Sequence, residues 1–99
     1  MNYLTYKGKQ WPLRVSYYAL KQYQAETGKG IEAIDEEFSN LEILLHYGLV
    51  AGAKAEGTEM DLKREDMEFF LDECLSDFNE ILLNSFEKNI SGKNTSKKK

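Results

Sequence analysis

The chain has 99 residues and a formal net charge of −4, with 41% hydrophobic and 30% charged residues. A chain of this length buries roughly two thirds of its unfolded surface, which suffices for one core and excludes a second domain of ordinary size. Four of the thirteen basic residues lie in positions 91–99. Positions 1–90 therefore hold nine basic and seventeen acidic residues, a formal charge of −8. This charge excludes the basic surface that nucleic-acid-binding domains usually have.

The N-terminal segment has the pattern of a β-hairpin. Residues 3–6 and 11–15 are rich in β-forming side chains and flank the Lys-Gly-Lys run at 7–9, in which Gly8 can take a positive φ. Pro12 has no amide hydrogen to give to a strand ladder. It therefore predicts an edge strand, or a strand position whose nitrogen faces solvent.

Two helical patterns follow the hairpin. Ser16 can cap a helix over residues 17–27, and Gly28 supplies the left-handed conformation that commonly ends one. Residues 31–38 place isoleucine and phenylalanine on one side and acidic residues mostly on the other. This spacing predicts a short second helix.

A third helix start is predicted at Ser39. Ser39 and Glu42 have the spacing of a capping box, in which each side chain bonds to the backbone amide of the other residue. Phe38 and Ile43 then stand at the two positions of a hydrophobic staple. The sequence thus predicts that Ser39 caps the helix and that Phe38 packs against its first turn.

This third helix carries two glycines one turn apart, Gly48 and Gly52, and a leucine-rich face formed by Leu41, Leu44, Leu45 and Leu49. Each glycine costs about 1 kcal/mol of helix propensity relative to alanine. We therefore expect a neighbouring backbone to pack closely against the helix at these positions.

The C-terminal third is predicted to be a loop over residues 53–60 and then a helix that starts near Asp61. Ser76 either caps a last helix or lies within one continuous helix. We predict one domain over residues 1–90 and a disordered basic tail over residues 91–99. The fold class is α+β and predominantly helical, an N-terminal β-hairpin packed on a bundle of four to five helices.

No group of side chains predicts catalysis, a cofactor or a metal. His46, the only histidine, has no ligand cluster at helical spacing, and Cys74, the only cysteine, has the character of a small core residue. A nucleophilic pair of Cys74 and His46 would need a third, orienting residue, and none is marked. The acidic runs lack the alternating ligands of a calcium loop. We predict a non-enzymatic protein without cofactor or metal.

The N-terminus lacks the basic-then-apolar layout of a signal peptide, and no apolar stretch approaches the roughly 20 residues that cross a bilayer. A single cysteine excludes an intramolecular disulfide. These features predict a cytoplasmic protein with no membrane partner.

Aromatic residues give the clearest indication of a binding surface. Tyr17-Tyr18 and Phe69-Phe70 are adjacent pairs on predicted helices, and neighbours about 100° apart cannot both point to the centre of one core. They form either a broad buried face or an apolar patch for a partner helix or for self-association into a homo-oligomer. The candidate contact residues are Tyr17, Tyr18, Met67, Phe69, Phe70 and Phe78.

The order of the motifs carries a family resemblance. A short strand and the turn Gly8-Lys9 lead to a strand ending in Leu13-Arg14-Val15, and Ser16-Tyr17-Tyr18-Ala19-Leu20 opens a helix that reaches Glu26-Thr27-Gly28. A short acidic helix, a small-residue-rich helix over residues 44–53 and the segment Leu62-Lys63-Arg64-Glu65-Asp66 follow. Over roughly residues 2–88 this layout resembles the tail assembly chaperones of long-tailed bacteriophages and prophages, although Lys63 stands where those proteins often have a threonine or serine cap.

The resemblance implies a non-virion protein of the host bacterial cytoplasm. Such a protein binds the long, largely helical tape measure protein and keeps it soluble while the tail tube polymerises around it. Tail tube subunits are a further candidate partner. Two alternatives stay open. The charge of residues 1–90 also fits an acidic DNA mimic that inhibits a nuclease or a DNA-binding protein. A minor virion connector or tail completion protein is the other alternative, and it would be present in purified particles, where a chaperone would not.

Overall fold

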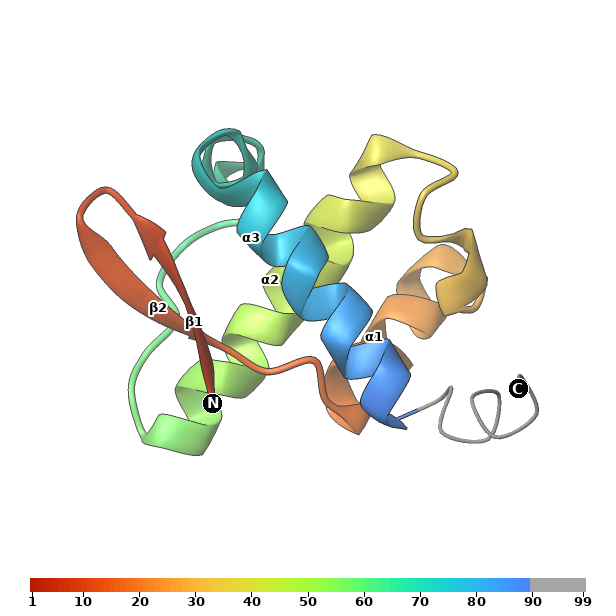
Figure 1. The fold of residues 1–99 in the computed structure, drawn as a ribbon, viewed down its shortest axis with the longest axis horizontal. Coiled ribbons are helices and arrows are strands. Elements are labelled where there is room, and N and C mark those ends of the chain that lie inside the picture. Colours follow the sequence, from red (N-terminus) through yellow and green to blue (C-terminus); the bar gives the residue numbers. More distant parts are fainter. Residues whose placement is uncertain (90–99) are drawn as a thin grey trace.

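The computed structural model describes residues 1–89 (Figure 1). Strands β1 (Asn2–Tyr6) and β2 (Lys9–Leu13) pair antiparallel, with Tyr6 opposite Lys9. The connecting turn is therefore Lys7-Gly8 alone, and both residues have positive φ, 54° and 75°. Such a two-residue turn matches the twist of the strands it joins. The predicted hairpin is confirmed.

The two strands form the whole sheet, so Pro12 lies on an edge strand, as its missing amide hydrogen requires. Period-two alternation turns four side chains of the hairpin toward the core: Leu4, Tyr6, Trp11 and Leu13. The hairpin thus contributes one buried face and one exposed face.

Helix α1 (Tyr17–Thr27) has both predicted caps. The Ser16 hydroxyl accepts a hydrogen bond from the Ala19 amide, and Gly28 takes a φ of 75° while its amide donates to the Gln24 carbonyl. These local signals placed the helix correctly because capping depends on residues within one turn.

The segment after α1 differs from the prediction. Residues 31–38 do not form an α-helix: only a single 3₁₀ turn, η1 (Ile31–Ala33), is present, and helix α2 (Phe38–Glu56) begins at Phe38. The predicted capping box is wrong, because Ser39 already lies inside the helix and its hydroxyl contacts the Glu37 carboxylate.

The start of α2 is set by a tertiary contact. Asn40 is buried, and its side-chain amide donates to the Ala33 carbonyl over 2.7 Å, which fastens the first turn of α2 to η1. Phe38 is 85% exposed, so the predicted staple is wrong as well. A buried amide must be hydrogen-bonded, and this requirement outweighs the local capping pattern.

The two glycines of α2 lie against β2, as expected. The Gly48 carbonyl accepts a hydrogen bond from the Arg14 amide over 3.0 Å. A Cβ atom added at Gly52 would collide with the Pro12 carbonyl and would lie 2.9 Å from the Leu13 nitrogen. The absence of side chains at these positions lets β2 pass directly over the helix.

The C-terminal boundaries were predicted wrongly. Helix α2 continues to Glu56 and ends at Gly57, which has a φ of 74°, so the loop starts later than residue 53. Helix α3 (Asp66–Asn89) begins at Asp66, where the Asp66 carboxylate accepts from the Lys63 amide over 2.8 Å. Cys74 has a non-helical φ of −139°, and α3 is bent at this residue.

The described part of the chain therefore has three α-helices and a two-stranded hairpin, about 62% helix. The broad α+β description agrees with this, but the predicted bundle of four to five helices is wrong. Residues 31–38 supply only a 3₁₀ turn, and the last two predicted helices are the two arms of bent α3. The predicted tail at 91–99 lies outside the described residues.

The elements enclose one core, in which β2 and α1 pack on α2 and β1 packs on α3, while α3 crosses α2 (Figure 1). At its centre the Phe70 ring stacks on Tyr6 with ring centroids 4.7 Å apart, and Trp11 meets Phe70 edge-on at 6.3 Å. Within residues 1–89, no helix combines the length and apolar character needed to cross a membrane.

Candidate functional site

The six candidate contact residues divide into two groups. Met67, Phe70 and Phe78 are completely buried, because residues spaced three and four apart on α3 all face the core. These three are core residues, and the structure does not bring them to the surface. Tyr17, Tyr18 and Phe69 are 79%, 44% and 60% exposed. The surface candidates are therefore these three.

Phe69 stands beside an apolar groove between the first turns of α2 and the first arm of α3. The groove has a volume of about 390 Å³. Its exposed apolar residues include Phe38 (85%) and Leu75 (42%) besides Phe69. We call it the Phe69 groove, and it is lined by Phe38, Leu41, Glu42, Glu68, Phe69, Leu71, Asp72 and Leu75.

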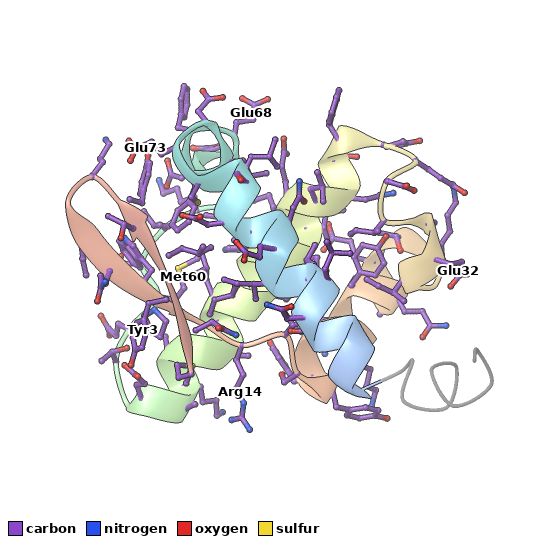
Figure 2. All side chains as sticks on the ribbon, viewed as in Figure 1. Tyr3, Arg14, Glu32, Met60, Glu68 and Glu73 are labelled. Atoms are coloured by element: carbon purple, nitrogen blue, oxygen red, sulfur yellow. The ribbon has the colours of Figure 1, made fainter. Side chains whose placement is uncertain are left out.

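The rim of the Phe69 groove is acidic. Glu42, Glu68 and Asp72 line it, and none of them takes part in an ion pair among the described side chains. A second hollow that Phe69 also lines adds Asp66 and Glu73, together with one cation, Lys7. Figure 2 shows Glu68 and Glu73 at the upper edge of the molecule. Phe69 therefore lines two hollows bordered by carboxylates.

Sequence reasoning missed Phe38, which it assigned to a staple. Its exposure follows from the Asn40 contact that starts α2 one residue before Ser39. No local signal marked this, because the partner of Asn40 is a carbonyl seven residues away.

A third surface hollow, of about 370 Å³, lies beside Tyr18 and has basic residues on its border. It sits between the β2–α1 connection and the C-terminal half of α2. The Tyr18 ring forms one side and meets Tyr47 edge-on at 6.4 Å. We call it the Arg14–Lys54 hollow, and it is lined by Arg14, Ser16, Tyr18, Val50, Ala51, Lys54 and Ala55.

Four polar side chains from α1, α2 and the α2–α3 loop form a cluster that sequence reasoning did not find. The Arg64 guanidinium binds both oxygens of Glu26, at 2.6 and 3.0 Å, and its Nε donates to His46 Nδ1 over 3.0 Å. The Tyr47 hydroxyl donates to the same Glu26 carboxylate. These contacts join residues up to 38 positions apart, so no spacing rule predicts them.

Both ring nitrogens of His46 are occupied. Because Nδ1 accepts from Arg64, the proton of the neutral ring sits on Nε2, which lies 3.4 Å from the Leu62 carbonyl. Hydrogen bonding to Arg64 lowers the pKa of Glu26, whose carboxylate stays ionised. The cluster therefore fastens three elements together and offers no free general base.

We expect the stability of the protein to fall on acidification as His46 takes up a proton. Burial, followed by the nearby Arg64 charge, holds the pKa of His46 below its ordinary value of 6.5. The unfolded chain is protonated first, so unfolding takes up a proton. The contribution of His46 is complete above pH 6.5 and is lost as the pH falls from there toward the lower pKa of the folded state.

Urea-unfolding midpoints of the wild type and of His46→Gln, measured between about pH 8 and about pH 5, check this expectation. Carboxylates titrate in both proteins, so the difference between the two curves isolates the histidine. The wild type should lose more stability than the variant. Parallel curves would contradict the assigned bonds of His46.

Cys74 is a core residue. It is buried, and its thiol donates to the Phe70 carbonyl over 3.2 Å. Burial, then the charges of Asp77 and Glu73, raises the pKa of the thiol to about 11. The nucleophilic thiolate is thus scarce at neutral pH. Across the described residues, no three His, Cys, Asp or Glu side chains are grouped so as to hold a metal ion.

Comparisons of the chain with models of protein families, with curated proteins and with solved structures found no match.

Proposed function

We propose that this chain is a non-enzymatic tail assembly chaperone that holds a phage tape measure protein through the Phe69 groove. The groove is the observation that supports the proposal most. Phe38, Phe69 and Leu75 expose large apolar surfaces at one place, beside a hollow of about 390 Å³. Contiguous exposed apolar patches are typical of contact surfaces for other proteins. The order of the sequence motifs, which resembles that of tail assembly chaperones, is the reason for proposing the tape measure protein as the partner and the bacterial cytoplasm as the location.

The chemistry of the groove indicates the kind of client segment it accepts. Its centre is apolar, and Glu42, Glu68 and Asp72 lie on its border. An amphipathic helix whose apolar stripe is flanked by lysine or arginine would bury its apolar side chains there and pair its charges with the rim. Ion pairs at an exposed rim are weak, which suits a client that must be released during assembly.

Replacing Phe69 with serine is expected to weaken client capture while leaving the fold intact. An aromatic side chain at the centre of a contact surface commonly contributes about 2 kcal/mol, or roughly a thirty-fold change in affinity. The Phe69 ring is 60% exposed, so the free energy of unfolding should change by no more than about 0.5 kcal/mol. Affinity capture of the tagged chain from cells expressing its neighbouring genes, followed by mass spectrometry, measures the effect.

The matched control is Tyr17→Ser. Tyr17 is also an exposed aromatic residue, at 79%, but it lines none of the three hollows. Capture of a very long, helix-rich protein by the wild type and by Tyr17→Ser, but not by Phe69→Ser, supports the proposal. Equal capture by all three proteins would show that the Phe69 groove is not the contact surface.

An acidic DNA mimic is a second candidate, favoured by the carboxylates that surround Phe69. Asp66, Glu68, Asp72 and Glu73 border the two hollows that this ring lines. A mimic would capture a nuclease or another DNA-binding protein. It would also depend on carboxylates rather than on apolar contact, so Glu68→Gln with Asp72→Gln should abolish capture while Phe69→Ser should not.

A further inference from the structure

We propose that the chain self-associates head to tail, with Phe69 and the adjacent carboxylates of one copy seated at the Arg14–Lys54 hollow of the next copy. The inference goes beyond the proposed function, because it concerns a second surface and needs no client. It assigns an occupant to a hollow that the chaperone proposal leaves unused. It also implies that the Phe69 groove is covered by another copy when no client is bound.

The Arg14–Lys54 hollow has the chemistry of an acceptor for an acidic, apolar segment. Val50, Ala51 and Ala55 of α2 contribute short apolar side chains to its lining. Arg14 and Lys54 are exposed, no acidic residue lines the hollow, and neither cation forms an ion pair with the side chains that the structure describes. Two uncompensated cations are therefore presented beside apolar surface.

The backbone beneath Arg14 is held in place. The Arg14 amide donates to the Gly48 carbonyl, and the Arg14 carbonyl accepts from the Ser16 amide, both over 3.0 Å. Ser16 in turn caps α1. The base of the Arg14 side chain is thus fixed by β2, α1 and α2 together, which preorganises the hollow.

The Phe69 side of the molecule presents the complementary chemistry. Phe69 projects from α3 between Glu68 and Asp72, which both line the same groove. An exposed ring with carboxylates on either side matches an apolar lining bordered by two cations. Among the side chains that the structure describes, no cation lines the Phe69 groove and no anion lines the Arg14–Lys54 hollow, so the two surfaces are opposite in charge.

The two surfaces lie on different sides of the molecule. In Figure 2, Arg14 is at the lower edge, whereas Glu68 and Glu73 are at the upper edge. One copy therefore does not satisfy its own hollow. Each contact joins the Phe69 groove of one copy to the Arg14–Lys54 hollow of another. A pair of copies therefore still has one free groove and one free hollow, so the assembly grows or closes into a ring. Each copy carries a net charge of −4, and this general repulsion keeps the assembly weak.

The test is sedimentation velocity on the full chain and on two charge-reversed variants over a series of concentrations. The hollow variant carries Arg14→Glu and Lys54→Glu, and the rim variant carries Glu68→Lys and Asp72→Lys. We expect the wild type to form species larger than a monomer as its concentration rises. Each variant should be monomeric over the same range, with its dissociation constant raised by roughly tenfold or more.

Mixing the two variants provides the decisive measurement. The hollow variant keeps an intact Phe69 groove, and the rim variant keeps an intact Arg14–Lys54 hollow. An equimolar mixture should therefore associate where neither variant does so alone, because the intact groove of one variant meets the intact hollow of the other, and the two reversed surfaces also carry opposite charges. A variant with Lys21→Glu and Lys63→Glu has the same net charge as the hollow variant and alters neither surface; it should associate like the wild type.

Three results would overturn the inference: a wild type that is monomeric throughout, a hollow variant that associates like the wild type, or a mixture that stays monomeric. These results are separable from the chaperone proposal. A monomeric wild type that still captures its client in a Phe69-dependent way refutes self-association only. If the chain associates head to tail but Phe69→Ser does not weaken client capture, only the assignment of the Phe69 groove as the client site is refuted.

Discussion

Replacing Gly52 with alanine is expected to destabilise the protein by about 3 kcal/mol or more, although alanine is the better helix former by about 1 kcal/mol. The added Cβ would collide with the Pro12 carbonyl and lie 2.9 Å from the Leu13 nitrogen. Both are backbone atoms of β2, so no side chain can rotate away and the strand itself must move. Urea unfolding followed by circular dichroism measures the loss.

Gly48→Ala is the matched control on the same face of α2. Its added Cβ would lie 2.8 Å from the Leu13 Cδ1 atom, the end of a flexible side chain. We expect a change of no more than about 1 kcal/mol, because helix propensity offsets the repacking of one methyl group. If both variants lose the same stability, β2 does not cross α2 at Gly52 as described.

Replacing Phe70 with alanine is expected to cost about 3–5 kcal/mol. The Phe70 ring is completely buried, stacks on Tyr6 at 4.7 Å and meets Trp11 edge-on at 6.3 Å. Its removal leaves a cavity where the hairpin meets α3, and this loss is a large share of the roughly 5–15 kcal/mol that stabilises a small domain. Thermal and urea unfolding of the variant measure it.

Phe69→Ala provides the control, since it makes the same change one residue away. Phe69 is 60% exposed, and we expect its loss to change stability by no more than about 0.5 kcal/mol. A large loss at position 69 with a small loss at position 70 would mean that α3 is rotated about its axis. The Phe69 groove would then not exist in the form described.

Several features that depend on neighbouring residues were predicted correctly. The hairpin with a positive φ at Gly8 and the Ser16 and Gly28 caps of α1 are confirmed, although β2 starts at Lys9 and ends at Leu13 instead of spanning residues 11–15. Each is a matter of backbone dihedral angles and of hydrogen bonds within about one turn, and these are dictated by local residue types. The close approach at Gly48 and Gly52 was also predicted, because two glycines within a helix need a packing reason.

Other features, which depend on contacts between elements, were not predicted. Ser39 was expected to cap α2, but the buried Asn40 amide, bound to the Ala33 carbonyl, starts the helix at Phe38. The helix count failed because residues 31–38 form only a 3₁₀ turn and α3 continues through its bend at Cys74. At Ser39 the local capping pattern was weaker than the contact between Asn40 and Ala33.

The candidate site shows the same division. The sequence identified adjacent aromatic residues as the surface candidates but not which of them would be exposed. Burial of Phe70 and exposure of Phe69 follow from the side of α3 that β1 covers. The acidic rim, the Arg14–Lys54 hollow and the cluster around Arg64 each combine side chains from at least two elements.

The sequence by itself determined the charge of the chain, the hairpin, the caps of α1 and the presence of a leucine-rich helix with a closely packed glycine face. These depend on composition, on period-two and period-3.6 spacing, and on local dihedral preferences. Only the tertiary structure decided where α2 and α3 begin, which aromatic residues are exposed and which charges surround them. Burial and electrostatic environment are properties of several elements packed together, and residues far apart in the sequence supply them.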